Sequence, residues 1–342
     1  MENWIKAHSA NDDIVLSSRI RLARNIKGYP FPNKLSKDKA IEIIKRVESA
    51  FYTSSYINEN FKTINMDSID AMEINSYFEK HIISDNLIAS KDISAFILDK
   101  DEIISIMINE EDHLRMQYIV GGFNLKKAYE EVDKIDNLLE EKLEFVFDSD
   151  LGYLTACPTN AGTGLRASVM LHLPALHETK EIENVFNAVS KIGMTIRGLY
   201  GEGSKGYGNI FQISNQITLG PSEEEIINGL NAMVYQIIEK EKLAREKLKS
   251  QYEYELEDKI MRSLGILKSA VLLDSKECMN LLSNVRFGVE MGIINHIDKV
   301  ILNELMVETG VATLQLNANS ALDKRERDLN RAQIVRNKLQ NL

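Results

Sequence analysis

Residues 157–169 read Cys-Pro-Thr-Asn-Ala-Gly-Thr-Gly-Leu-Arg-Ala-Ser-Val. The first eight positions are small or polar, which indicates a loop whose backbone approaches something closely, with a polar ligand as the expected object. Amides and hydroxyls of this loop can hydrogen-bond to such a ligand, and Arg166 adds a planar five-donor group suited to phosphate. The alternative is a glycine-rich connector with a buried Cys157 and a surface arginine, and the stretch alone leaves both interpretations open.

The composition indicates an ordinary globular chain. It has 342 residues, 44% of them hydrophobic and 27% charged, which allows a sizeable core and predicts two domains. No stretch approaches the ~20 apolar residues of a membrane-spanning helix, and the N-terminus lacks a signal-peptide pattern. Two cysteines argue against a disulfide framework and predict a cytoplasmic location. A net charge of −10 disfavours direct nucleic-acid binding.

Arginines are placed selectively in the first part of the chain. Only seven precede residue 245, and all but Arg46 lie in short motifs, which favours phosphate or carboxylate binding. In residues 14–25, alternation predicts a strand with Arg19 and Arg21 on one face. Two adjacent guanidinium groups repel each other, so an anion between them would relieve the conflict. A half-exposed strand with solvated charges is the alternative.

Two further loops carry acids. Glu110, Glu111 and Asp112 follow a predicted hairpin over 94–98 and 103–109, and three adjacent carboxylates repel unless cations or a ligand lie among them. One of them could accept a proton from a substrate, whereas the alternative is a solvated acidic turn. Residues 198–208 contain five glycines and a single acid, Glu202, which predicts either a flap that closes over a substrate or a flexible hairpin tip.

The remaining pattern predicts an α+β fold followed by helices alone. Helices are expected over about 36–52, 124–143, 178–193 and 222–250, and strands over 144–147, 154–156, 167–173, 194–200 and 209–215. From residue 251 onward only helices are expected, over 253–268, 275–291, 295–309 and 319–340. We therefore predict a catalytic domain over 1–245, with a mostly antiparallel sheet flanked by helices, and an all-helical domain over 251–342.

Four motifs taken together resemble the phosphagen (guanidino) kinase family. They span about the first 220 residues and comprise Ser17–Arg21, Asn109–Arg115, Cys157–Val169 and Arg197–Glu202. Within that family the chain is most similar to the bacterial protein-arginine kinases, because residues 327–332 match their RDxxRA pattern.

The chain departs from the small-molecule members of the family in two ways. Met170 and Tyr200 stand where those members usually have histidine and arginine. In addition, the first arginine-bearing strand begins near residue 17, without the helical lid domain that precedes it in those enzymes. The resemblance therefore implies a cleft that an arginine displayed on another protein can reach.

The resemblance implies transfer of the γ-phosphoryl group of ATP to a guanidinium nitrogen, with Mg²⁺ held mainly through the nucleotide and no protein-only metal site. Five arginines would bind the phosphates, namely Arg19, Arg21, Arg115, Arg166 and Arg197. Glu111 and Glu202 would hold the guanidinium group, with Glu111 as the better candidate base, and Cys157 would lie as a thiolate against a guanidinium nitrogen. The other implied nucleotide contacts are Ser17, Ser18, Ile20, His81, the backbone of residues 166–170, which adds Ala167, Ser168, Val169 and Met170, and Gly198, Leu199, Tyr200 and Gly201.

The implied function is that of a protein-arginine kinase that marks proteins for a ClpC-type protease during stress and responds to an McsA-type activator. Arg327, Asp328 and Arg331 would form an allosteric phosphoarginine site in a helical domain that also forms a homodimer. Two alternatives stay open from the residues: a kinase of free arginine or another small guanidino compound, and a catalytically silent adaptor that reads phosphoarginine.

Overall fold

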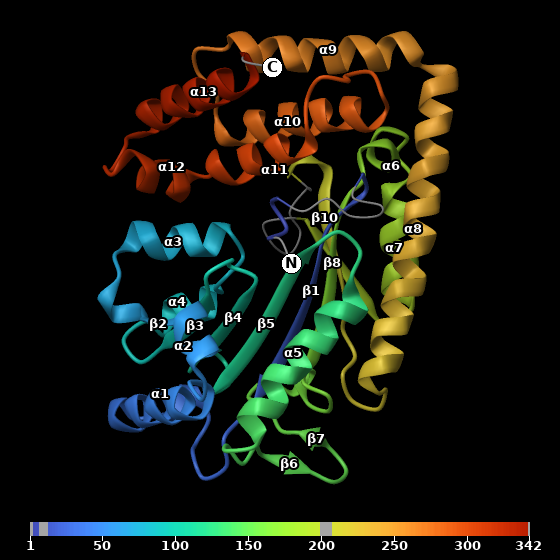
Figure 1. The fold of residues 1–342 in the computed structure, drawn as a ribbon. Coiled ribbons are helices and arrows are strands. Elements are labelled where there is room, and N and C mark those ends of the chain that lie inside the picture. The colour runs from blue at the N-terminus through green and yellow to red at the C-terminus, as the bar shows by residue number, and fades with distance from the viewer. Residues whose placement is uncertain (1–2, 7–12, 199–206, 341–342) are drawn as a thin grey trace.

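An eight-stranded sheet forms the centre of the computed structural model, which describes residues 3–6, 13–198 and 207–340 (Figure 1). Its strand order is β2-β3-β4-β5-β1-β8-β10-β9, and every paired neighbour is antiparallel. The strands are β1 (Val15–Arg24), β2 (Phe61–Asn65), β3 (Ala95–Asp99), β4 (Ile104–Ile108), β5 (Leu114–Gly121), β8 (Leu165–His172), β9 (Met194–Gly198) and β10 (Ile210–Asn215). A separate hairpin pairs β6 (Phe147–Asp148) with β7 (Gly152–Tyr153).

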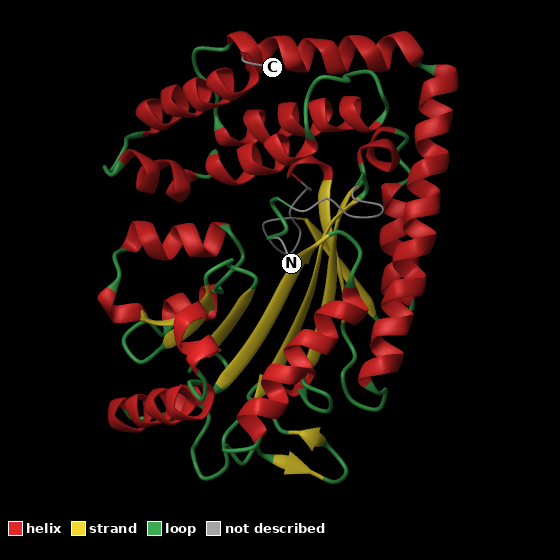
Figure 2. Ribbon diagram, viewed as in Figure 1, coloured by secondary structure: helices red, strands yellow, loops and turns green. Residues whose placement is uncertain are grey.

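Helices cover the apolar face of this sheet (Figure 2). Apolar side chains of α5 and α8 belong to the same buried core as alternate residues of β1 and β8. The cause is the period-2 alternation along each strand, which places Ile20 and Leu22 on the face opposite Arg19 and Arg21. The helices of this part are α1 (Lys37–Phe51), α2 (Ser55–Asn60), α3 (Ala71–Glu79), α4 (Asp85–Ala89), α5 (Leu125–Glu140), α6 (Pro174–Glu178), α7 (Ile182–Lys191) and α8 (Glu223–Gln251).

The C-terminal part is entirely helical in the described residues and lies across the end of the sheet where β8 terminates (Figure 1). It contains α9 (Glu253–Ser269), α10 (Ser275–Glu290), α11 (Lys299–Glu308), α12 (Val311–Ala318) and α13 (Lys324–Gln340). Buried polar contacts join the two parts: the His172 ring nitrogen Nε2 lies 2.8 Å from Ser283 Oγ, and Arg245 Nη2 lies 2.8 Å from Glu290 Oε2. Pairing of this kind is what allows charges to be buried at an interface.

The predicted class, an antiparallel sheet with flanking helices and a helical end, is confirmed. Local predictions differ in several places, and helices α2, α3, α4 and α6 were not predicted. Strands β2 and β5 were not predicted, because one follows a weakly periodic segment and the other follows the acidic turn directly. The hairpin strand β7 is Gly152–Tyr153 rather than 154–156. The helix predicted over 319–340 begins only at Lys324, because Asn319 adopts a left-handed conformation with φ of 50° and ends the separate helix α12.

Among the described residues, the structure contains no helix that is both long and apolar enough to cross a membrane.

Candidate active site

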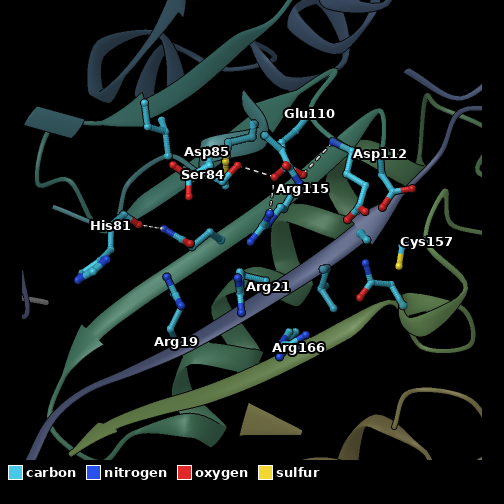
Figure 3. Close-up of a pocket in the computed structure, with 18 of the residues that line it drawn as sticks. Arg19, Arg21, His81, Ser84, Asp85, Glu110, Asp112, Arg115, Cys157 and Arg166 are labelled. Carbon is cyan, nitrogen blue, oxygen red and sulfur yellow. Dashed lines mark hydrogen bonds and ion pairs between the residues drawn. The ribbon is translucent and has the colours of Figure 1, made fainter. Parts of the chain in front are cut away.

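A cleft of about 750 Å³ opens on the sheet face that α5 and α8 leave uncovered. Side chains from several strands and from the loops around residues 81–86, 110–112 and 157–160 line it. Figure 3 shows His81 toward one end and Cys157 toward the other, with Arg19, Arg21 and Arg166 between them on the sheet. The cleft therefore brings together side chains from all four of the motifs found in the sequence.

The register of the antiparallel strands gathers the arginines. Arg21 of β1 lies directly opposite Arg166 of β8, and directly opposite residues of an antiparallel pair point to the same face. Arg115 of β5 and Arg197 of β9 also line the cleft, although they are separated from Arg166 by tens of residues in the chain. The predicted alternation in residues 14–25 is confirmed, because Arg19 and Arg21 face the cleft while Ile20 is buried behind the sheet.

This arginine cluster needs an anion. Burial, followed by repulsion from Arg115 and Arg166, lowers the pKa of Arg19 to about 9. The pKa of Arg21 is also lowered well below its usual value, mainly by burial and then by Arg19, Arg115 and Arg166. The Nε atom of Arg21 is buried without a hydrogen-bond partner in the described part of the chain. A bound phosphate group would supply both the missing negative charge and the missing acceptor.

Neutral side chains orient Arg19 and Arg166 in the cleft. Arg19 Nη2 donates to Gln212 Oε1 at 2.8 Å, and Arg166 Nη2 donates to Ser214 Oγ at 3.1 Å. Gln117 Nε2 donates to the carbonyl oxygen of His81 at 2.7 Å and fixes that residue at the cleft wall. The sequence analysis did not identify these three partners. Polar residues at alternate positions of apolar strands were the available signal, because such residues share a face with the arginines.

The three adjacent acids have three different environments. Glu110 is buried and accepts hydrogen bonds from Ser84, from Arg115 and, at 2.9 Å, from the amide nitrogen of Glu111. Burial alone would raise the pKa of Glu110, but Arg115 and these hydrogen bonds outweigh burial and lower it. Burial, and then repulsion by Glu110 and Asp112, raises the pKa of the half-buried Glu111. Burial also raises the pKa of Asp112, but Asp112 is almost fully buried and its Oδ1 accepts hydrogen bonds from Asn25 and from the amide nitrogen of Ala156. Glu111 is thus the more accessible acid for taking up a proton at the cleft.

Cys157 lies at the end of the cleft in a loop whose short 3-10 turn spans Pro158–Asn160. Its Sγ atom lies 3.0 Å from Thr159 Oγ1. The glycines of the loop serve the fold rather than a ligand: a Cβ atom at Gly164 would lie 2.6 Å from the carbonyl oxygen of Ala23, and one at Gly162 would collide with the backbone at Thr218. The close approach predicted from these glycines is therefore to the protein's own backbone, while Thr159 and Asn160 do line the cleft.

His81 is neutral, because burial followed by repulsion from Arg19 and Arg21 lowers its pKa to about 3. Its backbone has a φ of 62°, and it lines the cleft as predicted. Gly198 also lines the cleft.

Several predicted nucleotide contacts lie elsewhere. Ile20, Ala167 and Val169 are fully buried in the core behind the sheet, so their side chains do not line the cleft. Ser18 is occupied structurally, since its Oγ donates to the carbonyl oxygen of Gly122 at 2.8 Å and accepts from the amide nitrogen of Asn124 at 2.9 Å. Ser17, Ser168 and Met170 continue the arginine-bearing face but are buried and do not line the cleft. Leu199, Tyr200, Gly201 and Glu202 lie outside the described residues.

The helical motif forms a tight local cluster. The side chain of Arg331 is 1% exposed and that of Asp328 is 18% exposed, with Arg331 Nη1 donating to Asp328 Oδ1 at 2.7 Å. Arg331 also donates to the carbonyl oxygens of Thr309 at 2.9 Å and Leu273 at 2.8 Å. Arg327 is half-buried and donates to the carbonyl oxygen of Leu322 at 2.7 Å. The three residues are neighbours, but Arg331 is enclosed by protein.

The donor set of the cleft fits a nucleotide polyanion better than a protein-held metal. In the part of the chain that the structure describes, no three histidine, cysteine, aspartate or glutamate side chains are grouped to hold a metal ion. The cleft instead combines five guanidinium groups, a half-buried glutamate with a raised pKa and a thiol. Such a site can bind phosphates, accept a proton and contact a cationic group at its acidic end.

Two family models match the chain. Residues 42–244 match the model described as ATP:guanido phosphotransferase, C-terminal catalytic domain. Residues 253–342 match the model described as Protein-arginine kinase McsB C-terminal domain.

Similar proteins include curated relatives and solved structures. A protein-arginine kinase of Clostridium novyi is 54% identical over 100% of this chain and 99% of its own length, and one of Bacillus pumilus is 44% identical over 99% and 93%. Among solved structures, a lombricine kinase superposes with a TM-score of 0.60 at 26% identity, covering 68% of this chain and 67% of its own. A duplicated taurocyamine kinase from Schistosoma mansoni with bound transition-state-analogue components has a TM-score of 0.61 at 24% identity, covering 79% and 41%.

Proposed function

Because this chain belongs to the protein-arginine kinases of the ATP:guanido phosphotransferase family, we propose that its cleft transfers the γ-phosphoryl group of ATP to arginine side chains of proteins. The observation that carries the proposal is the arginine cluster of the cleft, where Arg21 Nε is buried without a hydrogen-bond acceptor among the described residues and lies beside guanidinium groups that repel one another. An ATP triphosphate is a polyanion of the required charge. Full-length similarity to protein-arginine kinases supports a protein acceptor.

The proposed chemistry assigns opposite tasks to the two sides of the cleft. Arg19, Arg21 and Arg166 would bind the phosphates and stabilise negative charge during transfer. A protonated guanidinium group is a poor nucleophile, so Glu111 would orient the target arginine and take the proton that leaves its attacking nitrogen. Cys157 would contact the same guanidinium group from the end of the cleft. In the balanced reaction, ATP and the arginine side chain give ADP, phosphoarginine and one proton.

Magnesium would be held mainly by the nucleotide phosphates, since the described residues offer no cluster of metal ligands. The Mg²⁺ ion would reduce the negative charge of the phosphates during transfer. Glu202 lies outside the described residues, and its role as a second carboxylate that holds the guanidinium group is proposed from the family resemblance alone.

Regulation through the helical part is a further element of the proposal. Glu79, which lines the cleft, accepts hydrogen bonds at the start of α12 from the amide nitrogens of Ala312 at 2.8 Å and Thr313 at 2.9 Å. Arg331 holds the carbonyl oxygen of Thr309 just before the same helix. A phosphoarginine that binds at Arg327 and Asp328 can therefore act on the cleft wall through α12.

The proposed cellular setting follows from the relatives rather than from the cleft. It comprises a cytoplasmic homodimer that acts in stress-related protein quality control, with an McsA-type activator and a ClpC-type protease as partners. Two free cysteines are consistent with a reducing compartment. Pull-down of the full chain with each purified partner tests the two partner assignments.

The central experiment compares acceptors. The full chain is incubated with Mg²⁺ and radiolabelled ATP, together with a casein-like protein or with free arginine. We expect acid-labile phosphate on arginine residues of the protein, identified by mass spectrometry, and little phosphate on free arginine. Glu111→Gln, which keeps the side-chain size but removes the carboxylate, is the control. Labelling of free arginine alone would favour a small-molecule kinase, and absence of ATP turnover would favour a silent adaptor.

A further inference from the structure

The end of β1 contacts both loops that carry the proposed catalytic groups. Asn25, only 1% exposed, makes three side-chain hydrogen bonds. Its Oδ1 accepts from the amide nitrogen of His113 at 2.9 Å, and its Nδ2 donates to Asp112 Oδ1 at 2.6 Å and to the carbonyl oxygen of Leu154 at 3.0 Å. One side chain therefore connects the acidic turn to the segment that leads into Cys157.

Asp112 completes the connection. It is 2% exposed, and its Oδ1 also accepts from the amide nitrogen of Ala156 at 2.7 Å. Glu111 is the residue before Asp112, and Cys157 is the residue after Ala156. The Asp112–Ala156 hydrogen bond thus links the neighbours of the two catalytic candidates directly, and we call Asn25 and Asp112 together the clasp.

The backbone around the clasp is held from the other side by His113. Its Nδ1 accepts from the amide nitrogen of Ile26 at 3.0 Å, which leaves Nε2 to donate to the carbonyl oxygen of Pro30 at 2.9 Å. Burial lowers the pKa of His113, so the neutral ring keeps this single tautomer at neutral pH. The turn that presents Glu111 is therefore fixed on both flanks.

A second buried contact also holds the end of β1. Arg24, the residue before Asn25, forms a buried pair with Asp136 of α5, with Arg24 Nη2 2.5 Å from Asp136 Oδ2. Arg24 Nη1 also donates to the carbonyl oxygen of Thr163 at 3.0 Å. Asp136 belongs to the helix behind the sheet, whereas Arg24 also contacts Thr163 and the ring of Tyr153 beside the Cys157 loop. The structural control on this strand end is therefore made at Asp136 and not at Arg24.

We propose that Asn25 and Asp112 are positioning residues for phosphotransfer, which set the Glu111 carboxylate and the Cys157 thiol at the separation that lets both contact one guanidinium group. The inference rests on the catalytic roles proposed above for Glu111 and Cys157. A guanidinium group is rigid and planar, so two groups that contact it must be placed accurately at the same time. Misplacement by about 1 Å commonly costs a factor of about 10² in rate.

Three variants separate positioning from other roles. Asn25→Asp keeps the acceptor for His113 but loses both donated hydrogen bonds and sets two carboxylates against each other. Asp112→Ala removes the link to Ala156. Asp112→Asn keeps Oδ1 as an acceptor for both of its partners and removes only the charge. We expect the first two variants to lower kcat by about 10²-fold while KM for ATP stays within about twofold, because no arginine is touched. Asp112→Asn should retain kcat within about fivefold.

The double variant Asn25→Asp/Asp112→Asn gives a rescue test. In this double variant the repulsion between two carboxylates is removed, while the amide oxygen at position 112 can still accept a hydrogen bond from the amide nitrogen of Ala156. The value of kcat should therefore recover by about tenfold over Asn25→Asp alone. The double variant also tests the positioning role if Asp112→Ala does not fold. Asp136→Asn is the matched control, since it weakens the neighbouring buried pair and should lower Tm without the loss of kcat.

The outcomes distinguish the clasp from the catalytic assignment. Full activity in Glu111→Gln and Cys157→Ser would overturn the proposed roles and this inference with them. Inactive Glu111→Gln combined with fully active Asn25→Asp and Asp112→Ala would overturn the clasp alone. The clasp also fails if Asp112→Asn is as inactive as Asp112→Ala, which would make the charge itself essential, or if Asp136→Asn loses kcat to the same extent at the same Tm.

Discussion

Replacement of Arg331 by methionine tests whether this residue of the RDxxRA motif stabilises the helical part or belongs to an open binding site. Arg331→Met keeps most of the aliphatic volume but removes every donor. The carbonyl oxygens of Thr309 and Leu273 then lose their partner, and Asp328 loses its ion pair at 2.7 Å. Because the Arg331 side chain is only 1% exposed, water cannot readily replace these contacts.

The magnitude follows from the number of groups left unpaired. Each buried carbonyl without a partner costs about 1–3 kcal/mol, and breaking a buried ion pair on one side costs about 3–5 kcal/mol, although Asp328 is partly solvated. We expect a loss of about 3–5 kcal/mol in the free energy of unfolding. For a chain of 342 residues that unfolds as one unit, this corresponds to a fall in Tm of about 5 °C.

Differential scanning calorimetry of the purified full chain measures this shift, with Arg325→Met as the control. Arg325 lies on the same helix but is exposed, and its replacement should change the free energy of unfolding by less than about 0.5 kcal/mol. Phosphoarginine binding, measured by titration calorimetry, provides the second readout. An unchanged Tm for Arg331→Met together with abolished phosphoarginine binding would refute the structural argument and show that the buried guanidinium opens to a ligand.

Three further outcomes are expected from the cleft and its connection to the helical part. A base must be deprotonated, and the pKa of Glu111 is raised. Activity should therefore fall with decreasing pH, with a midpoint above the usual glutamate pKa of 4.5. A pH profile of kcat/KM whose acidic limb has its midpoint below 4.5 would exclude Glu111 as the base. Mg-ATP at about 100 times its Kd should stabilise the protein by about 2.7 kcal/mol, because its phosphates relieve the repulsion around Arg19 and Arg21. Adenosine at the same concentration carries no phosphate and should raise Tm much less. Equal rises in Tm would contradict phosphate binding by the arginines. Thr313→Val removes the 2.8 Å hydrogen bond from Thr313 Oγ1 to Glu79 and should cost about 1 kcal/mol in stability. It should also weaken the response of the phosphotransfer rate to added phosphoarginine. An unaltered response would exclude α12 as the connection between the phosphoarginine site and the cleft.

The amino-acid sequence was sufficient for features that depend on local pattern. Alternation along residues 14–25 predicted the strand and the face of Arg19 and Arg21, since side chains of a strand alternate whatever its neighbours are. Capping and periodicity predicted most helices, and Ser222 with Glu225 forms the expected capping box. Motif chemistry, read through a family resemblance, predicted the α+β class and the kinase activity.

The sequence left open which side chains of a motif reach the cleft, because that depends on the strand face that each residue occupies. Residues 166–170 form one motif in the sequence, yet only Arg166 of this run lines the cleft while Ala167 and Val169 pack behind the sheet. The polar partners Gln117 and Gln212 lie outside the four motifs, although Gln117 is on the same strand as Arg115.

What the sequence by itself determined is the strongly patterned strands and helices and the chemical types available for catalysis. The tertiary structure decided which of three adjacent acids at the cleft is left half-exposed, that Arg331 is enclosed, and that Asn25 joins two loops 87 and 129 residues further along the chain. The physical reason is that burial, pKa and hydrogen-bond partners depend on long-range strand pairing, which brings distant residues within about 3 Å and has no counterpart in local periodicity.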